Sequence, residues 1–85
     1  MDQAKHQELI DLTWRYAVLI GITDPVGICT DDIVESDRRR FGHLIEKNDR
    51  GLPIFCEEDA VQFMAELSGQ PVEDCWKVLL EEWER

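Results

Sequence analysis

The residues best suited to nucleophilic catalysis or to binding a transition metal are three cysteines and two histidines. Cys29, Cys56 and Cys75 are far apart in the sequence, and neither His6 nor His43 lies at zinc-ligand spacing from any of them. A zinc site would have to gather its ligands from separate elements. A cysteine nucleophile would also need a histidine and an orienting acid beside it, which no pattern here predicts. We therefore expect no catalytic residue, no metal, no cofactor and no enzymatic activity.

A run of three arginines, Arg38 to Arg40, is the one basic cluster of the chain. Guanidinium groups bind phosphates and carboxylates through paired hydrogen bonds, so these residues are candidate anion contacts. The alternative is that they pair with Glu35, with Asp37 and with carboxylates on neighbouring helices. The formal net charge of −10 favours this alternative.

The bulk composition indicates one acidic globular domain spanning residues 1–85. Nineteen acids against nine bases would repel phosphates, so direct nucleic-acid binding is disfavoured and a basic protein partner is favoured. Three widely spaced cysteines are typical of a reducing compartment. The chain start does not resemble a signal peptide, and the longest apolar run, 16–22, is too short to span a membrane. We expect a cytoplasmic protein that does not enter membranes.

Residues 9–20 are expected to form the central helix, because two neighbouring apolar stripes leave only Asp11, Thr13 and Arg15 to face water. The full pattern predicts helices over 3–20, 31–48, 57–68 and 71–84, with an aspartate, Asp2, as the first cap. The fold class is therefore all-α, a small four-helix bundle-like domain. A minimal β bridge between the two loops, pairing 28–30 with 54–56, is the alternative to strand-free connections.

The last two expected helices form a hairpin that resembles a helix-turn-helix. Ala65 lies four residues before Gly69, and Cys75 and Val78 lie six and nine residues after it. A small residue, a turn glycine and two apolar positions at these intervals suit a tightly joined helix pair. Residues 57–85 nevertheless hold nine acids and two bases, a net charge of −7 that a phosphate-lined groove would repel.

The acidic hairpin is either a solvated outer face or a docking surface for a basic protein, such as a nuclease or another nucleic-acid-binding protein. In the second case the chain is an inhibitor or adaptor, and its expected partner-binding residues are Glu73, Asp74, Lys77, Glu81, Glu82 and Trp83. The alternative is a DNA-binding regulator that uses 57–85 with Arg38, Arg39 and Arg40 as phosphate contacts. A third hypothesis is a homodimer in which Trp76, Leu80 and Trp83 meet their copies.

Overall fold

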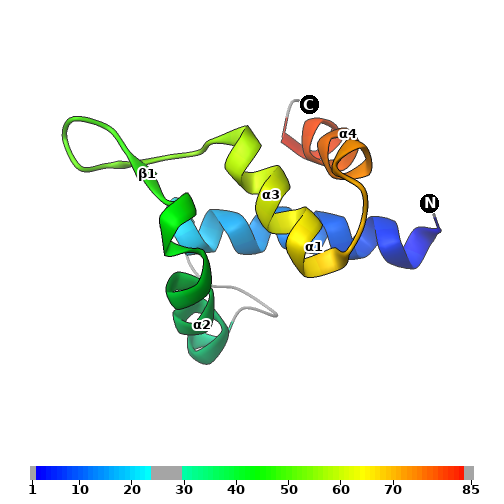
Figure 1. Ribbon diagram of the computed structural model, residues 1–85, viewed down its shortest axis with the longest axis horizontal. Coiled ribbons are helices and arrows are strands. Elements are labelled where there is room, and N and C mark those ends of the chain that lie inside the picture. Colours follow the sequence, from blue (N-terminus) through cyan, green and yellow to red (C-terminus); the bar gives the residue numbers. More distant parts are fainter. Residues whose placement is uncertain (1, 24–29, 84–85) are drawn as a thin grey trace.

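The computed structural model describes residues 2–23 and 30–83. These residues form four α-helices, of which the last three are arranged around the first (Figure 1). Helix α1, Gln3–Ile20, runs along the length of the molecule. It is followed by α2, Asp31–Phe41, and a 3-10 turn, η1, Gly42–Leu44. A two-stranded hairpin, β1 Glu46–Lys47 and β2 Pro53–Ile54, leads to α3, Glu57–Ser68, and α4, Val72–Trp83. The predicted all-α class is confirmed.

Helix α1 has the predicted ends and the predicted central position. Asp2 caps it, since its carboxylate accepts a hydrogen bond from the Lys5 N–H at 2.8 Å, and Gly21 ends it in a left-handed conformation with φ 85°. Its apolar side chains pack on α3, α4 and, less extensively, α2. The main core takes side chains from every helix and η1: Leu9, Tyr16, Phe41, Leu44, Phe63, Met64 and Leu79 are among its members.

Three residues of α1 are placed differently from the sequence expectation, and one of them, Arg15, expected to face water, turns instead toward Asp37 of α2. Thr13, expected to face water, is fully buried, because its hydroxyl donates a 2.6 Å hydrogen bond to the Ile10 carbonyl and so leaves no unpaired polar group. Trp14, expected on an apolar stripe, is 43% exposed. Its ring lies at the edge of the core, against the end of α4.

The second helix is shorter than predicted, and the strand pairing is also different. The helix expected over 31–48 ends at Phe41, because a turn further along the chain uses Asn48: its side-chain oxygen accepts from the N–H groups of Arg50 and Leu52. Glu46–Lys47 is therefore extended and pairs antiparallel with Pro53–Ile54. The alternative prediction, a bridge from 28–30 to 54–56, is wrong for Thr30, which caps α2 instead of pairing with a strand. Positions 28 and 29 lie outside the described residues.

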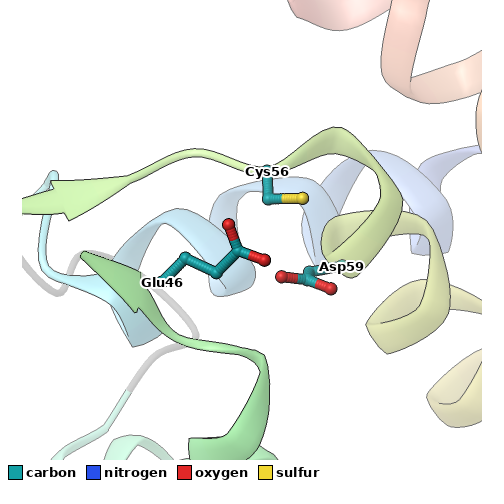
Figure 2. A group of neighbouring side chains, drawn as sticks. All are labelled: Glu46, Cys56 and Asp59. Carbon is teal, nitrogen blue, oxygen red and sulfur yellow. The ribbon is translucent and has the colours of Figure 1, made fainter. Parts of the chain in front are cut away.

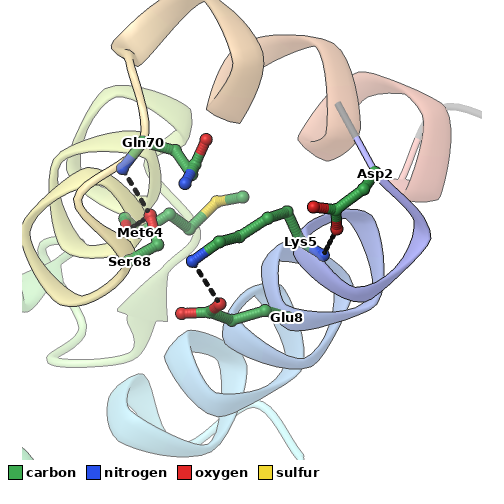
Figure 3. A network of polar contacts seen from close by, with 6 residues as sticks. All are labelled: Asp2, Lys5, Glu8, Met64, Ser68 and Gln70. Atoms are coloured by element: carbon green, nitrogen blue, oxygen red, sulfur yellow. Dashed lines mark hydrogen bonds and ion pairs between the residues drawn. The ribbon is translucent and has the colours of Figure 1, made fainter.

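The predicted boundaries of the C-terminal helix pair agree with the structure to within one residue, apart from positions 84–85, which are not described. Gly69 closes α3 with φ 73° and donates its N–H to the Ala65 carbonyl at 2.9 Å. The Ser68 hydroxyl donates to the Met64 carbonyl and accepts from the Gln70 N–H, as Figure 3 shows. This three-residue connection fixes how α4 leaves α3.

Several large apolar residues are exposed rather than packed in the core. They are Val72 and Leu80 on α4, and Ile22, Leu52 and Ile54 on the two connections. The hairpin carries two of them outward, since a two-strand ribbon with no element packed over it covers little apolar surface. No helix in the described part of the chain is long and apolar enough to cross a membrane.

Candidate functional site

The outer face of α4 presents the first group of predicted partner-binding residues. Glu73, Lys77 and Glu81 follow one another at four-residue intervals, which places them on one line along the helix, and all three are exposed. Asp74 is half-buried in the first turn, where a carboxylate complements the helix dipole. We call Glu73, Asp74, Lys77 and Glu81 the acidic face.

The other two predicted binding residues, Glu82 and Trp83, turn toward α1. Glu82 accepts a 3.2 Å hydrogen bond from the indole N–H of Trp14. The Trp83 ring lies 4.8 Å from the Trp14 ring and 4.9 Å from the Phe55 ring, measured between centroids. Its own indole N–H is buried and has no hydrogen-bond partner among the described residues. These contacts give both side chains a structural role in attaching the end of α4.

A groove of about 690 Å³ lies between α3 and α4, where the sequence predicted closed packing. Val61 and Ala65 line it from α3, and Val72 and Trp76 line it from α4. Val72 is 51% exposed and Trp76 is half-buried, so both offer apolar surface to a partner. The helical periodicity could not reveal this, because an apolar stripe looks the same whether another helix covers it or not.

The α3 side of this groove has a polar rim. Glu58, Gln62 and Glu66 are exposed and follow one another at four-residue intervals beside the Val61–Ala65 floor. Glu66 is 3.5 Å from a guanidinium nitrogen of Arg40, in a pair whose two side chains are at least half exposed. An apolar floor beside carboxylates is the arrangement that accepts an apolar side chain flanked by a cation.

A second hollow of about 220 Å³ lies toward the C-terminal end of α4. Its walls are Ile22, Phe55, Glu57, Leu79, Leu80 and Trp83. The larger groove is lined by α3 from Glu58 to Glu66 and by the first half of α4, whereas the second hollow brings Glu57, at the beginning of α3, together with Trp83, at the end of α4. Because a short turn joins the end of α3 to the beginning of α4 and the opposite ends meet in the second hollow, the two helices run in roughly opposite directions. We call the two hollows together the α3–α4 groove.

The arginine cluster lies at the end of α2, where Arg40 reaches Glu66 on the rim of the groove. Arg39 pairs with Glu35 at 2.6 Å and Arg40 with Glu66 at 3.5 Å, which confirms the predicted pairing with Glu35 and with a neighbouring helix. The expected pairing with Asp37 is wrong, because another arginine holds that carboxylate. Arg38 is exposed, with no ion pair to any residue in the described ranges.

A buried ion pair that the sequence did not predict joins α1 to α2. Arg15 donates from Nε and Nη2 to the two carboxylate oxygens of Asp37, each at 2.7 Å. The Asp37 side chain is 5% exposed and that of Arg15 27%. The position of Asp37 between the buried Val34 and Phe41 was the available signal: an acid on an apolar helix face needs a buried partner.

A thiol and two carboxylates meet where the hairpin joins α3 (Figure 2). The ligand atoms of Glu46, Cys56 and Asp59 all lie within 4.8 Å of one another, so the fold does gather potential metal ligands from separate elements. Sulfur and carboxylate oxygen are donors that zinc accepts, and a complete site would need a fourth ligand or water. Glu46 is exposed and belongs to a two-residue strand, and neither histidine joins the group.

The clearest effect of this cluster is electrostatic. Burial, and then the neighbouring Asp59 and Cys56 groups, raise the pKa of Tyr16 well above its ordinary value of 10.0. The phenol stays protonated and donates a 3.4 Å hydrogen bond to the Leu44 carbonyl. Burial likewise raises the pKa of the Cys75 thiol above 9.0, so this side chain is an inert core residue rather than a nucleophile.

The resemblance of the C-terminal hairpin to a helix-turn-helix extends to its packing positions. Cys75 and Val78 are buried as expected, and Ala65 is half-buried. No known protein family, characterised protein or solved structure gives a significant match to this chain. The geometry of the site therefore carries the functional argument.

Proposed function

We propose that this chain is a non-enzymatic interaction module that docks a basic protein through the α3–α4 pair. The observation that carries the proposal is the juxtaposition of the acidic face, Glu73, Asp74, Lys77 and Glu81, with an apolar groove on the same two helices. Carboxylates around apolar surface speed the encounter with a cationic partner by electrostatic steering, and the apolar contact slows dissociation.

The arginine cluster supports this choice over the DNA-binding alternative. Arg39 and Arg40 are already near the carboxylates of Glu35 and Glu66, so a phosphate would have to compete with them. Residues 57–85 carry a net charge of −7 and would face the same phosphates. An inhibitor or adaptor of a basic nuclease or nucleic-acid-binding protein fits this charge distribution better.

The test is capture of basic proteins from the native lysate in the presence of nuclease. Wild-type protein is compared with the double variant Glu73→Lys/Glu81→Lys, which reverses only exposed positions and leaves Glu82 on Trp14 and Asp74 at the helix start. The charge-matched control is Glu35→Lys/Asp49→Lys, at exposed positions on α2 and the hairpin turn. We expect the first variant to lose at least tenfold in capture of the same basic protein, and the control to retain it.

Two results would contradict the proposal. One is equal loss in both double variants, which would indicate a general charge effect without a docking face. The other is capture that disappears with nuclease, which would mean that nucleic acid bridges the complex and would favour the DNA-binding alternative.

A further inference from the structure

We infer that the α3–α4 groove receives a single amphipathic helix of the partner, with an apolar stripe flanked by lysine or arginine. This inference rests on the proposed function and specifies its binding mode. It uses the stripe Val72, Trp76 and Leu80 on α4 and the floor Val61 and Ala65 on α3.

The shape of the groove indicates a helix rather than an extended strand. Val72, Trp76 and Leu80 are spaced by four residues, so they form one continuous stripe along α4. The antiparallel α3 contributes Val61 and the small Ala65 beside it, which leaves room between the two helices. Adjacent helix ridges with an open groove between them are the surface on which a third helix packs.

The lengths of the two helices set an upper limit on the length of the partner helix that they can contact. Helices α3 and α4 have 12 residues each, which corresponds to about 18 Å at about 1.5 Å per residue. A partner helix of about three turns covers this distance and places three apolar anchors on one face, at the usual three- and four-residue spacings.

The charges around the groove select a basic helix over a second copy of this chain. Glu57 and Glu58 line it from α3, and Glu73 directly follows the groove residue Val72 on α4. Glu66 also lines the groove, but its carboxylate is already 3.5 Å from Arg40. Two copies meeting through this groove would bring these carboxylates together, at a cost in Coulomb repulsion. A helix with cations on both sides of its apolar stripe would pair with them instead.

The probe is a synthetic 14-residue helical peptide with leucines on one stripe and lysines on both flanks, labelled for fluorescence anisotropy. We expect Val72→Asp to weaken its binding at least tenfold, because the new carboxylate would be covered by leucine. The matched control, Leu52→Asp, changes a similarly exposed residue on the hairpin, away from the groove, and should bind within twofold of wild type. Both positions are more than half exposed, so neither variant should disturb folding.

Two further peptides test the chemistry. One has the same composition with its leucines spread around the helix, and the other carries glutamate in place of lysine. Both should bind at least tenfold more weakly. Equal binding of the spread-leucine peptide would contradict the inference of helix binding in the groove, since charge alone would then explain the binding. Equal weakening by Val72→Asp and Leu52→Asp would overturn it as well.

The peptide and capture experiments fail independently. If capture depends on Glu73 and Glu81 but the peptide does not bind, the inference of helix binding in the groove is contradicted and the proposed docking function is supported. If the peptide binds specifically but no basic protein is captured, the proposed function is contradicted and the inference of helix binding in the groove is supported. Sedimentation that shows a dimer sensitive to Val72→Asp would overturn the basic-helix inference in favour of self-association.

Discussion

Helix α2 and the α3–α4 pair both pack on α1, but they do so through different chemistry. The body of α2 meets α1 through the buried Arg15–Asp37 pair and a small separate cluster of Val18 with Val34. The α3–α4 pair meets α1 through the main apolar core and a chain of aromatic rings that runs from Trp14 to Phe63, which only the last residue of α2, Phe41, joins among the described rings.

This difference shows which side of the molecule leaves charged and apolar surface exposed for a partner. The α2 side directs polar groups inward or at one another, as in Arg15 with Asp37 and Arg39 with Glu35. The α3–α4 side satisfies its core with apolar groups and leaves carboxylates and an apolar groove outside. Stability should therefore be sensitive to polar substitutions on the α2 side, and binding to substitutions on the α3–α4 side.

The largest effect is expected from Asp37→Ala, which would leave the Arg15 guanidinium without its bidentate partner. Removing one member of a buried pair costs about 3–5 kcal/mol, and because Arg15 is 27% exposed we expect the lower end, about 3 kcal/mol. Urea unfolding followed by circular dichroism measures this. A double-mutant cycle with Arg15→Met should show coupling of at least about 1 kcal/mol; additive losses would mean that the pair does not hold α2 to α1.

Trp83→Ala and Trp76→Ala should separate attachment of α4 from binding. Trp83 stacks on Trp14 and Phe55, so its truncation should cost about 2 kcal/mol, less than for a fully buried tryptophan. Trp76 lines the groove, so its truncation should cost less stability and weaken the lysine-flanked peptide at least tenfold. Unfolding curves and anisotropy on both variants test this. The reverse pattern would make Trp83 the binding residue that the sequence predicted.

Alkaline pH should lower the free energy of unfolding by destabilising the main apolar core, which contains Cys75 and Tyr16. The unfolded chain releases the Cys75 proton near pH 9 and the Tyr16 proton near pH 10, whereas burial raises both pKa values in the folded chain. Stability that is present below pH 9 is therefore lost as the pH rises, first through Cys75 and then through Tyr16. Urea midpoints between pH 8 and 10.5 should fall less steeply for Cys75→Ala than for wild type, and parallel curves would contradict the prediction.

Gly69→Ala should cost about 1 kcal/mol, because φ at this position is 73° and a side chain disfavours that conformation. A Cβ there would meet no atom within 4 Å, so the cost is conformational and not steric. Gly42 is the matched control on the α2 side: its Cβ would be equally free, and its φ is −57°. Gly42→Ala should therefore leave stability unchanged or raise it by about 0.5 kcal/mol. Thermal unfolding of both variants distinguishes the two cases.

Local signals in the sequence were sufficient for most of the helix boundaries and insufficient for the surface. Asp2, Gly21 and Gly69 mark helix ends through side-chain or backbone geometry that acts within a few residues. The hairpin was missed because the Asn48 turn competes with a helix pattern that would otherwise continue. The exposure of Val72 and Leu80, and the partner of Asp37, depend on how helices far apart in sequence are placed, which periodicity does not specify.

The smallest effect is expected from Arg39→Ala, at about 0.5 kcal/mol or less, because both members of its pair with Glu35 are largely exposed and water screens them. Urea unfolding in low salt gives the most sensitive measurement, and a loss above about 1 kcal/mol would contradict the estimate.

The arginine cluster also tests the comparison between the α2 side and the α3–α4 side. Replacing Arg38, Arg39 and Arg40 together by alanine makes the protein more acidic, and capture of a basic protein through α3–α4 should then be retained or strengthened. Loss of capture in this triple variant would place the α2 side within the binding surface.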